Sequence, residues 1–419
     1  PVFSILASSP YIPAELSSSI RIFPLFTAEA FSVLTKKDES AGMYAKNSNA
    51  INKKKITIEG KDSAGILVEL TKNNKEITGT NDIADNSAID KDNGLIEIKN
   101  KNSVGMLGKV TNSVTTATSK LTLSNKKAIN VDNESSVGMM LINDSKNDVL
   151  DRANVKAENT GVITLKNSAT NKENIGILAK KNSTAINKDN GIINVNSVKS
   201  IGMLAKEGSK IENNTTIPTN PPGVGQEYGI NLKAEDGVGM LAEGKNSKNE
   251  VSTAVNNGKI NIISTAKKSI GILAQNEGDV KNKKEIEISA EEGVGIFVSE
   301  TGTGENVGPN GEINILAKKS VGIFAKNNGN THTAKNSGTI NLGKTDGTTT
   351  DESLIGMFAQ ADSGKIASVK NEAGGIINVN TKKSVGMYAK NDSTNTEASI
   401  DLHNAGTINI NNTGSAGIY

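Results

Sequence analysis

The chain has 419 residues, with 47 basic and 45 acidic side chains, a formal net charge of +2 and no cysteine. The basic residues form no stripe, which gives no support to nucleic-acid binding. The absence of thiols excludes disulfides and thiolate metal sites. Aromatic residues make up 3% of the chain and tryptophan is absent, so an aromatic globular core is not expected. No apolar run reaches the ~18 residues of a membrane-spanning helix.

Residues 1–35 differ in composition from the rest of the chain. They hold four of the eight prolines and four of the seven phenylalanines, and the first residue is proline, so we expect a fragment. The stretch 21–30 resembles the end of a signal peptide, but its apolar part is short and contains Pro24. We prefer a cap over the first coil, because the ends of a solenoid need shielding. A signal remnant and a disordered tail are the alternatives.

From residue 36 onward the chain repeats a glycine-centred segment. It reads Ser-Val-Gly-Met-Tyr-Ala-Lys-Asn at 384–391, with variants at 103–107, 200–206 and 320–326. The intervals run from 23 residues (Gly42 to Gly65) to 40 residues (Gly65 to Gly105). Repeats of this length predict a solenoid. The anchoring glycines are Gly42, Gly65, Gly105, Gly138, Gly176, Gly202, Gly239, Gly271, Gly295, Gly322, Gly356, Gly386 and Gly417.

A second segment, Gly-x-Ile-polar-Ile, lies between most anchors, as at 94–98, 258–262, 338–342 and 406–410. A weaker third segment precedes it, as at 184–187 and 253–256. Apolar residues alternate with period two, and Asn, Asp, Gly and Lys separate the segments, which indicates strands. We therefore predict an all-β fold, a right-handed parallel β-helix of about thirteen coils over residues 36–419. The chain stops inside an anchor at Tyr419, so we expect this domain to be truncated at its C-terminus.

Units longer than the others predict insertions between the strands. The candidates are Leu70–Ala88, Asn143–Asn159, Glu212–Tyr228, Ser299–Gly311 and Gly343–Ser353. The third of these carries the one close proline cluster inside the repeats, and proline cannot donate to a strand ladder, so it is a loop. Loops on solenoids carry recognition, and the candidate binding loop comprises Pro218, Pro221, Pro222 and Tyr228. A plain connecting loop is the alternative.

The residue two positions after each anchoring glycine is large and apolar in every repeat. Strict alternation would place this side chain outside, where it would form an exposed apolar stripe that marks an interaction surface. We prefer the alternative, that the glycine forms a bulge or corner and turns the side chain into the core. The candidate stripe residues with aromatic rings are Phe297, Phe324, Phe358 and Tyr388.

Catalytic patterns are weak. His332 and His403 lie in different repeats without a Ser, Cys or carboxylate at a recognisable spacing, and the only arginines are Arg21 and Arg152. No phosphate-binding loop or repeated calcium-binding nonapeptide occurs. Asparagines after the strands, as at 327–328 and 390–392, are interpreted as left-handed turn residues whose amides can stack between coils. We predict no catalytic residue, no metal site and no cofactor.

The chain resembles the passenger region of large type V autotransporter adhesins, most of all the fusobacterial type. The resemblance is carried by the repeats at 41–47, 103–107, 384–391 and 406–410 and by a composition rich in Lys and Asn and poor in Arg and Cys. The resemblance covers residues 36–419. It implies a non-enzymatic passenger at the extracellular bacterial surface, with a translocator barrel in the outer membrane outside this chain. The implied partner is a host-cell or bacterial surface protein or glycan. A secreted polysaccharide-degrading β-helix enzyme and a purely structural spacer are the alternatives.

Overall fold

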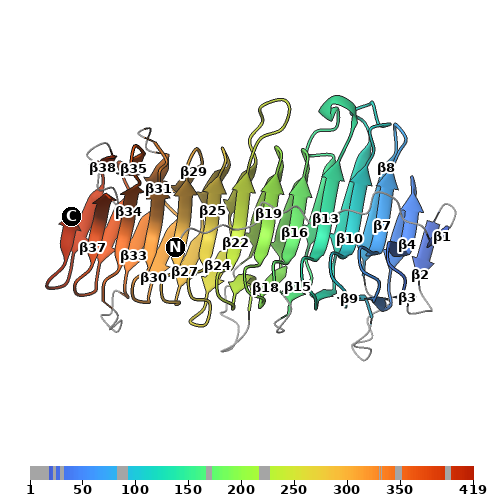
Figure 1. The fold of residues 1–419 in the computed structure, drawn as a ribbon, viewed down its shortest axis with the longest axis horizontal. Coiled ribbons are helices and arrows are strands. Elements are labelled where there is room, and N and C mark those ends of the chain that lie inside the picture. Colours follow the sequence, from blue (N-terminus) through green and yellow to red (C-terminus); the bar gives the residue numbers. More distant parts are fainter. Residues whose placement is uncertain are drawn as a thin grey trace. The chain divides into compact units, whose positions relative to one another are not determined.

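The computed structural model describes residues 18–21, 25–28, 33–82, 93–166, 172–216, 227–329, 331, 333–344, 352–391 and 398–419, with side chains from residue 33 onward. These residues form forty β-strands and one short 3-10 turn, η1 (Lys146–Asp148), and no α-helix occurs among them. Successive strands belong in turn to three parallel sheets, here called A, B and C (Figure 1). Thirteen turns of three strands, followed by β40 (Ala416–Ile418), confirm the predicted right-handed parallel β-helix.

The chain forms two compact units, one from residues 1–212 and 246–250 and the other from 213–245 and 251–419. In the first unit, sheet A contains the glycine-centred strands β1 (Ser18–Arg21), β4 (Ser40–Lys46), β7 (Ala64–Leu70), β10 (Val104–Val110), β13 (Val137–Asn143), β16 (Ile175–Lys180) and β19 (Ile201–Lys206). Sheet B contains β2 (Leu25–Ala28), β5 (Asn49–Asn52), β8 (Glu76–Asn81), β11 (Lys120–Asn125), β14 (Val155–Asn159) and β17 (Thr184–Asp189). Sheet C contains β3 (Val33–Thr35), β6 (Ile56–Ile58), β9 (Leu95–Ile98), β12 (Ala128–Val131), β15 (Val162–Leu165) and β18 (Ile192–Val195).

The second unit repeats the same order after β20 (Lys210–Thr215), which spans the boundary in the sequence. Its sheet A contains β22 (Val238–Glu243), β25 (Ile270–Gln275), β28 (Val294–Ser299), β31 (Val321–Lys326), β34 (Ile355–Ala361), β37 (Val385–Asn391) and β40. Sheet B contains β23 (Thr253–Asn256), β26 (Asp279–Asn282), β29 (Thr303–Asn306), β32 (Ala334–Asn336), β35 (Ile366–Asn371) and β38 (Ser399–Asn404). Sheet C contains β21 (Gly229–Leu232), β24 (Lys259–Ile262), β27 (Glu285–Ile288), β30 (Glu312–Ile315), β33 (Thr339–Leu342), β36 (Ile376–Val379) and β39 (Thr407–Ile410).

The core of each unit is a set of apolar ladders. In sheet C the two apolar residues of the Ile-polar-Ile segment point inward in each strand. In β27 these residues are Ile286 and Ile288, and both are fully buried. The polar residue between them faces outward, as the period of two requires. Because the strands pair residue for residue with their neighbours, Ile286 and Ile288 of β27 stack on Ile313 and Ile315 of β30.

The anchoring glycine occupies an irregular position in sheet A. Between β28 and β31, Val294 pairs with Val321 and Ile296 with Ile323, while the glycines between them form no pair. A Cβ atom on Gly295 would lie 2.6 Å from the carbonyl oxygen of Gly322, closer than any side chain tolerates. The glycine is required because the backbones of adjacent coils approach each other too closely for a side chain.

Buried asparagines link adjacent coils at or near the ends of the sheet-B strands. In the second unit each amide nitrogen donates to the side-chain oxygen of the next asparagine at 2.8 Å, along Asn213, Asn256, Asn282, Asn306, Asn336, Asn371 and Asn404. The first unit has a corresponding ladder along Asn52, Asn81, Asn125, Asn159 and Asn187. The prediction of stacked amides is thus confirmed, but at another position. The turn residue Asn327 is left-handed, with φ of 55°, and bonds to Asp362 instead of stacking in this ladder.

Three of the predicted insertions contain a whole sheet-B strand, a fourth, Glu212–Tyr228, begins inside the sheet-B strand β20, and that part of the prediction was wrong. Leu70–Ala88 includes β8, Asn143–Asn159 includes β14 and Ser299–Gly311 includes β29. The sequence Thr-Gly-Glu-Asn of β29 has no apolar alternation, and its pairing with β26 and β32 makes it a strand. Residues 217–226 and 345–351, within the other two predicted insertions of the second unit, lie outside the described residues.

Candidate functional site

The candidate aromatic stripe forms a stack on sheet A of the second unit. The ring centroids of Phe297 and Phe324, and of Phe324 and Phe358, are 4.8 Å apart, and the planes differ by 11° and 10°. Tyr388 continues the stack at 5.2 Å from Phe358, and Tyr419 at 5.7 Å from Tyr388. Because each ring face lies against its neighbour, the stack presents ring edges to solvent. A sugar ring stacks on an aromatic face, so the stack is a poor sugar platform.

The side chains of the candidate stripe are mostly buried or half-buried. Phe297 is 7% exposed, whereas Phe324, Phe358 and Tyr388 are half-buried. The same position is 7% exposed or less at Leu67, Leu107, Met140, Leu178, Leu204, Leu241 and Leu273. Stacking between coils covers each side chain on two sides, as shown by Phe297, which pairs with Leu273 and Phe324.

Burial at this position does not mean that the side chain enters the core. The hydroxyl of Tyr44 in β4 donates to the Glu69 carboxylate of β7 at 2.7 Å. Tyr44 pairs with Leu67, two residues before Glu69, and residues two apart lie on the same side of a strand. Lys46 also lies 3.8 Å from Glu69. Tyr44 therefore lies on the same polar side as Lys46 and Glu69, and the preferred interpretation, a glycine that turns this side chain inward, does not hold there.

Of the candidate binding loop, only Tyr228 is described, since Pro218, Pro221 and Pro222 lie outside the described residues. Tyr228 is half-buried directly before β21, and the Lys259 ammonium lies 6.0 Å from the centroid of its ring. This is the outer range of a cation–π contact. The structure thus connects Tyr228 with the outer face of sheet C.

Lys259 anchors a charged cluster on that face. Its ammonium lies 2.9 Å from a carboxylate oxygen of Glu285 and 2.9 Å from one of Glu287, both in the adjacent β27. Burial of Lys259 lowers its pKa, but hydrogen bonds and charge attraction from the two carboxylates outweigh that effect and raise the pKa above its ordinary value of 10.5. The ammonium is therefore a permanent positive charge that holds Glu287 in place.

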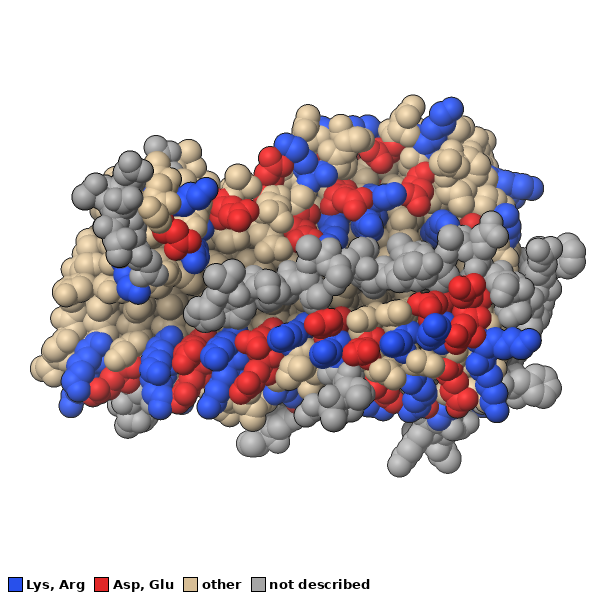
Figure 2. Space-filling view, viewed as in Figure 1, with Lys and Arg blue, Asp and Glu red and all other residues tan. Residues whose placement is uncertain are grey.

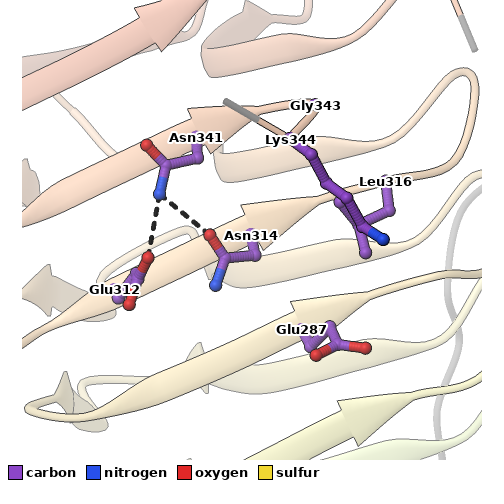
Figure 3. Close-up of a pocket in the computed structure, with 7 residues that line it drawn as sticks. All are labelled: Glu287, Glu312, Asn314, Leu316, Asn341, Gly343 and Lys344. Carbon is purple, nitrogen blue, oxygen red and sulfur yellow. Dashed lines mark hydrogen bonds between the residues drawn. The ribbon is translucent and has the colours of Figure 1, made fainter. Parts of the chain in front are cut away.

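Next to this cluster the outer face of sheet C is hollowed (Figure 3). The hollow has a volume of about 320 Å³ and is lined by Glu287, Glu312, Asn314, Leu316, Asn341, Gly343 and Lys344. The lining residues come from β27, β30, β33 and the segments directly after β30 and β33. We call this the sheet-C hollow. It combines carboxylates, amides, one ammonium and one half-buried apolar side chain, Leu316.

A row of amides runs out of the sheet-C hollow along the outer face. The Asn341 amide nitrogen donates to Asn314 Oδ1 and to Glu312 Oε1, both at 2.9 Å. Asn378 donates to Asn341 and Asn409 donates to Asn378, each at 2.8 Å. These four asparagines occupy the polar position of the Gly-x-Ile-polar-Ile repeat. Sequence reasoning recognised the repeat but missed this row, although equivalent positions in successive coils already place its members side by side.

The described residues offer little for metal or acid–base catalysis. Within the described parts of the chain, no group of three or more His, Asp or Glu side chains could hold a metal ion. His403 is exposed on β38 and Arg152 is half-buried, whereas His332 lies outside the described residues.

Figure 2 shows lysines and carboxylates interspersed on the face it draws, and pairs such as Lys318–Glu291 at 2.7 Å and Lys383–Glu352 at 2.9 Å join neighbouring coils. No helix among the described residues is long and apolar enough to cross a membrane.

Comparison with known families gives one match. Residues 111–308 match the family described as the BigA third pectate lyase-like domain. BigA is an autotransporter adhesin, so this region is similar to an autotransporter passenger. The match includes Glu287 but ends before Glu312 and the rest of the sheet-C hollow. No curated protein and no solved structure matches the chain.

Proposed function

We propose that the chain is a non-enzymatic part of an autotransporter passenger, exposed at the extracellular bacterial surface, and that it attaches the cell to host or bacterial surfaces. The observation that carries this proposal is the match of residues 111–308 to a domain of an autotransporter adhesin. The fold agrees with such a role, because a β-helix holds its outer faces rigidly and offers them to large partners. The likeness to the fusobacterial type of adhesin is part of the proposal.

The contact site that we propose in the described part of the second unit is the sheet-C hollow. Four of its lining residues, Glu287, Glu312, Asn314 and Asn341, extend from paired strands, so their positions are fixed by the ladder. A site on rigid elements loses little conformational entropy when it binds a ligand. Attachment through this face would leave the insertions, including the loop before Tyr228, as a second contact region.

Cleavage of polysaccharides is the second candidate function, and the words "pectate lyase-like" in the family description favour it. The sheet-C hollow has two carboxylates that could serve as acid and base. However, Glu287 is bound to Lys259 and Glu312 accepts a hydrogen bond from Asn341. One oxygen of each carboxylate is thereby held by a side chain of a neighbouring coil, which disfavours their use as an acid–base pair.

Two assays with the purified chain test the proposal. The labelled chain should bind epithelial or bacterial cells saturably, and an inert β-helical protein of similar size serves as the control. Incubation with polygalacturonate and with neutral polysaccharides should release no new reducing ends. Absence of cell binding would contradict the attachment function. Release of reducing ends that stops in Glu312→Gln would establish the enzymatic alternative.

A further inference from the structure

The amide row on sheet C has a direction, and one donor at its end is left over. Asn409, Asn378 and Asn341 each donate to the asparagine of the preceding coil. The next position in that direction belongs to Glu287, which pairs with Asn314 in the β27–β30 register. A carboxylate is a good acceptor, so Asn314 would be expected to donate to Glu287.

The Asn314 amide nitrogen instead has no hydrogen-bond partner among the described residues. Among those residues, the Asn314 side chain makes one hydrogen bond, in which its oxygen accepts from Asn341. In the preceding coil, Oε2 of Glu287 accepts from Lys259 at 2.9 Å. Figure 3 shows the Asn314 nitrogen pointing toward the strand of Glu287 and away from Asn341. The sheet-C hollow therefore contains an N–H donor that is held through its own amide oxygen, has no partner among the described residues, and shares the lining with Glu287 and Glu312.

This combination selects a class of ligand. Hydroxyl groups both donate and accept, so neighbouring hydroxyls could accept from Asn314 and donate to the acceptor-only carboxylates Glu287 and Glu312. Leu316 offers an apolar contact for the C–H groups of a sugar ring. A uronate would bring a third carboxylate to a lining that holds two carboxylates and one ammonium, Lys344, and like charges at short range repel.

We propose that the sheet-C hollow binds a neutral sugar residue of a glycan through two adjacent hydroxyl groups. One hydroxyl accepts from Asn314 Nδ2, and its neighbour donates to Glu312 or Glu287. The proposal deepens the attachment function and rests on it, because it names the ligand class of that surface. It also distinguishes this chain from a binder of pectate, whose sugars are acidic.

The test is ligand-observed NMR on the purified full chain with four neutral probes: lactose, N-acetyllactosamine, cellopentaose and mannopentaose. Trigalacturonate is the acidic comparison. Saturation transfer to at least one neutral probe is expected, with little transfer to trigalacturonate. The first two probes represent host-type glycan ends and the last two represent linear polymers, so the pattern also shows the source of the sugar.

Asn314→Asp is the decisive variant, because it keeps the oxygen that accepts from Asn341 and removes the free donor. It should weaken binding about tenfold, the loss expected for one hydrogen bond in a polar site. Asn378→Ala is the matched control, since it interrupts the same row outside the sheet-C hollow, and its binding should change less than about twofold. If Asn314→Asp does not fold, Glu312→Gln replaces it and should weaken binding while keeping the acceptor for Asn341.

Binding of no neutral probe, equal binding by Asn314→Asp and wild type, or stronger binding of trigalacturonate would each overturn the proposal. The two levels of the account fail differently. If the chain attaches to cells but binds no probe, the sugar inference is wrong and the attachment function stands. If the chain binds a probe but attaches to no cell, the attachment function is wrong.

Discussion

The amide nitrogen of Asn282 lies 2.8 Å from the side-chain oxygen of Asn306 in the next coil, and both side chains are fully buried. Asn282 also accepts from Asn256 at 2.8 Å and reaches the backbone carbonyl of Lys284 at 3.2 Å. Each asparagine of this ladder thereby satisfies its neighbours, and all of them except the terminal Asn404 are shielded from water. The ladder fixes the spacing of the coils because a displaced coil would leave buried amides unpaired.

Asn282→Ala should therefore lower the free energy of unfolding by about 2–4 kcal/mol, since it leaves a buried donor of Asn256 and a buried acceptor of Asn306 unsatisfied. Chemical denaturation followed by circular dichroism measures this loss. Asn409→Ala is the control, because Asn409 also bonds to an asparagine of the neighbouring coil but is exposed. Its cost should stay below about 1 kcal/mol. Equal costs for the two variants would show that burial does not determine the strength of the ladder.

The anchoring glycines that are followed by a further coil should not tolerate even one methyl group. A Cβ atom on Gly322 would lie 2.6 Å from the carbonyl oxygen of Gly356. This neighbour is backbone and cannot move without separating the coils. Gly322→Ala should cost about 2–3 kcal/mol or more, as overpacking of a dense interior does.

Gly364→Asn is the control for this glycine experiment. A Cβ atom there meets nothing within 4 Å, and asparagine tolerates the left-handed φ of 68°. Its unfolding midpoint should stay near that of the wild type. An unchanged midpoint for Gly322→Ala would contradict the close approach of the two coils.

Strands with alternating apolar positions could be predicted from the sequence. Strands such as β29, which are recognisable only by their pairing with neighbouring strands, could not. Sheets A and C carry repeated apolar patterns, such as Val321–Lys326 and Thr339–Leu342. In sheet B, β29 has no apolar side chain, because Gly304 occupies an inward position where a Cβ would meet Val298 at 2.5 Å. Local sequence cannot show that a large neighbouring side chain fills that space.

The sheet-C hollow was accessible to prediction only in part. Glu287, Asn314 and Asn341 occupy equivalent positions of successive repeats, which is enough to place them side by side on the outer face. The sequence does not show that Glu287 bonds to Lys259, because that depends on side-chain conformation. The repeat spacing is enough to predict that the aromatic side chains of sheet A stack as a ladder. It is not enough to predict that the rings are half-buried and present their edges to solvent.

Lys259 should make stability depend on pH in the alkaline range. Its pKa is higher in the folded chain than the ordinary 10.5, so the proton stabilises the fold fully below about pH 10. Above pH 10.5 the unfolded chain loses this proton while the folded chain keeps it, so stability falls as the pH rises, by up to about 1.4 kcal/mol per pH unit from this group.

The measurement for Lys259 is the free energy of unfolding from pH 8 to pH 11.5, for wild type and Lys259→Met. The variant should be less stable at pH 8, because Glu285 and Glu287 lose their partner, and its decline above pH 10.5 should be shallower. Parallel curves for the two proteins would mean that Lys259 has the same proton affinity in the folded and unfolded chains.

The aromatic stack should act on stability and not on sugar binding. Phe324→Ala removes two ring contacts at 4.8 Å and should cost about 1–3 kcal/mol. Phe324→Leu, which keeps much of the apolar area, should cost less. In the NMR assay with neutral probes, both variants should bind like the wild type at a temperature where they are folded. Loss of probe binding in Phe324→Leu would move the contact site to sheet A.

The most direct measurement of the central claim is binding of the labelled chain to cells before and after mild periodate oxidation. Periodate cleaves the bond between carbons that carry adjacent hydroxyls, the group that Asn314 and the two carboxylates are proposed to recognise. Saturable binding to untreated cells should fall to the level of the Asn314→Asp variant after oxidation, while Asn378→Ala should follow the wild type throughout. Binding that survives periodate and disappears after protease treatment of the cells would contradict the account.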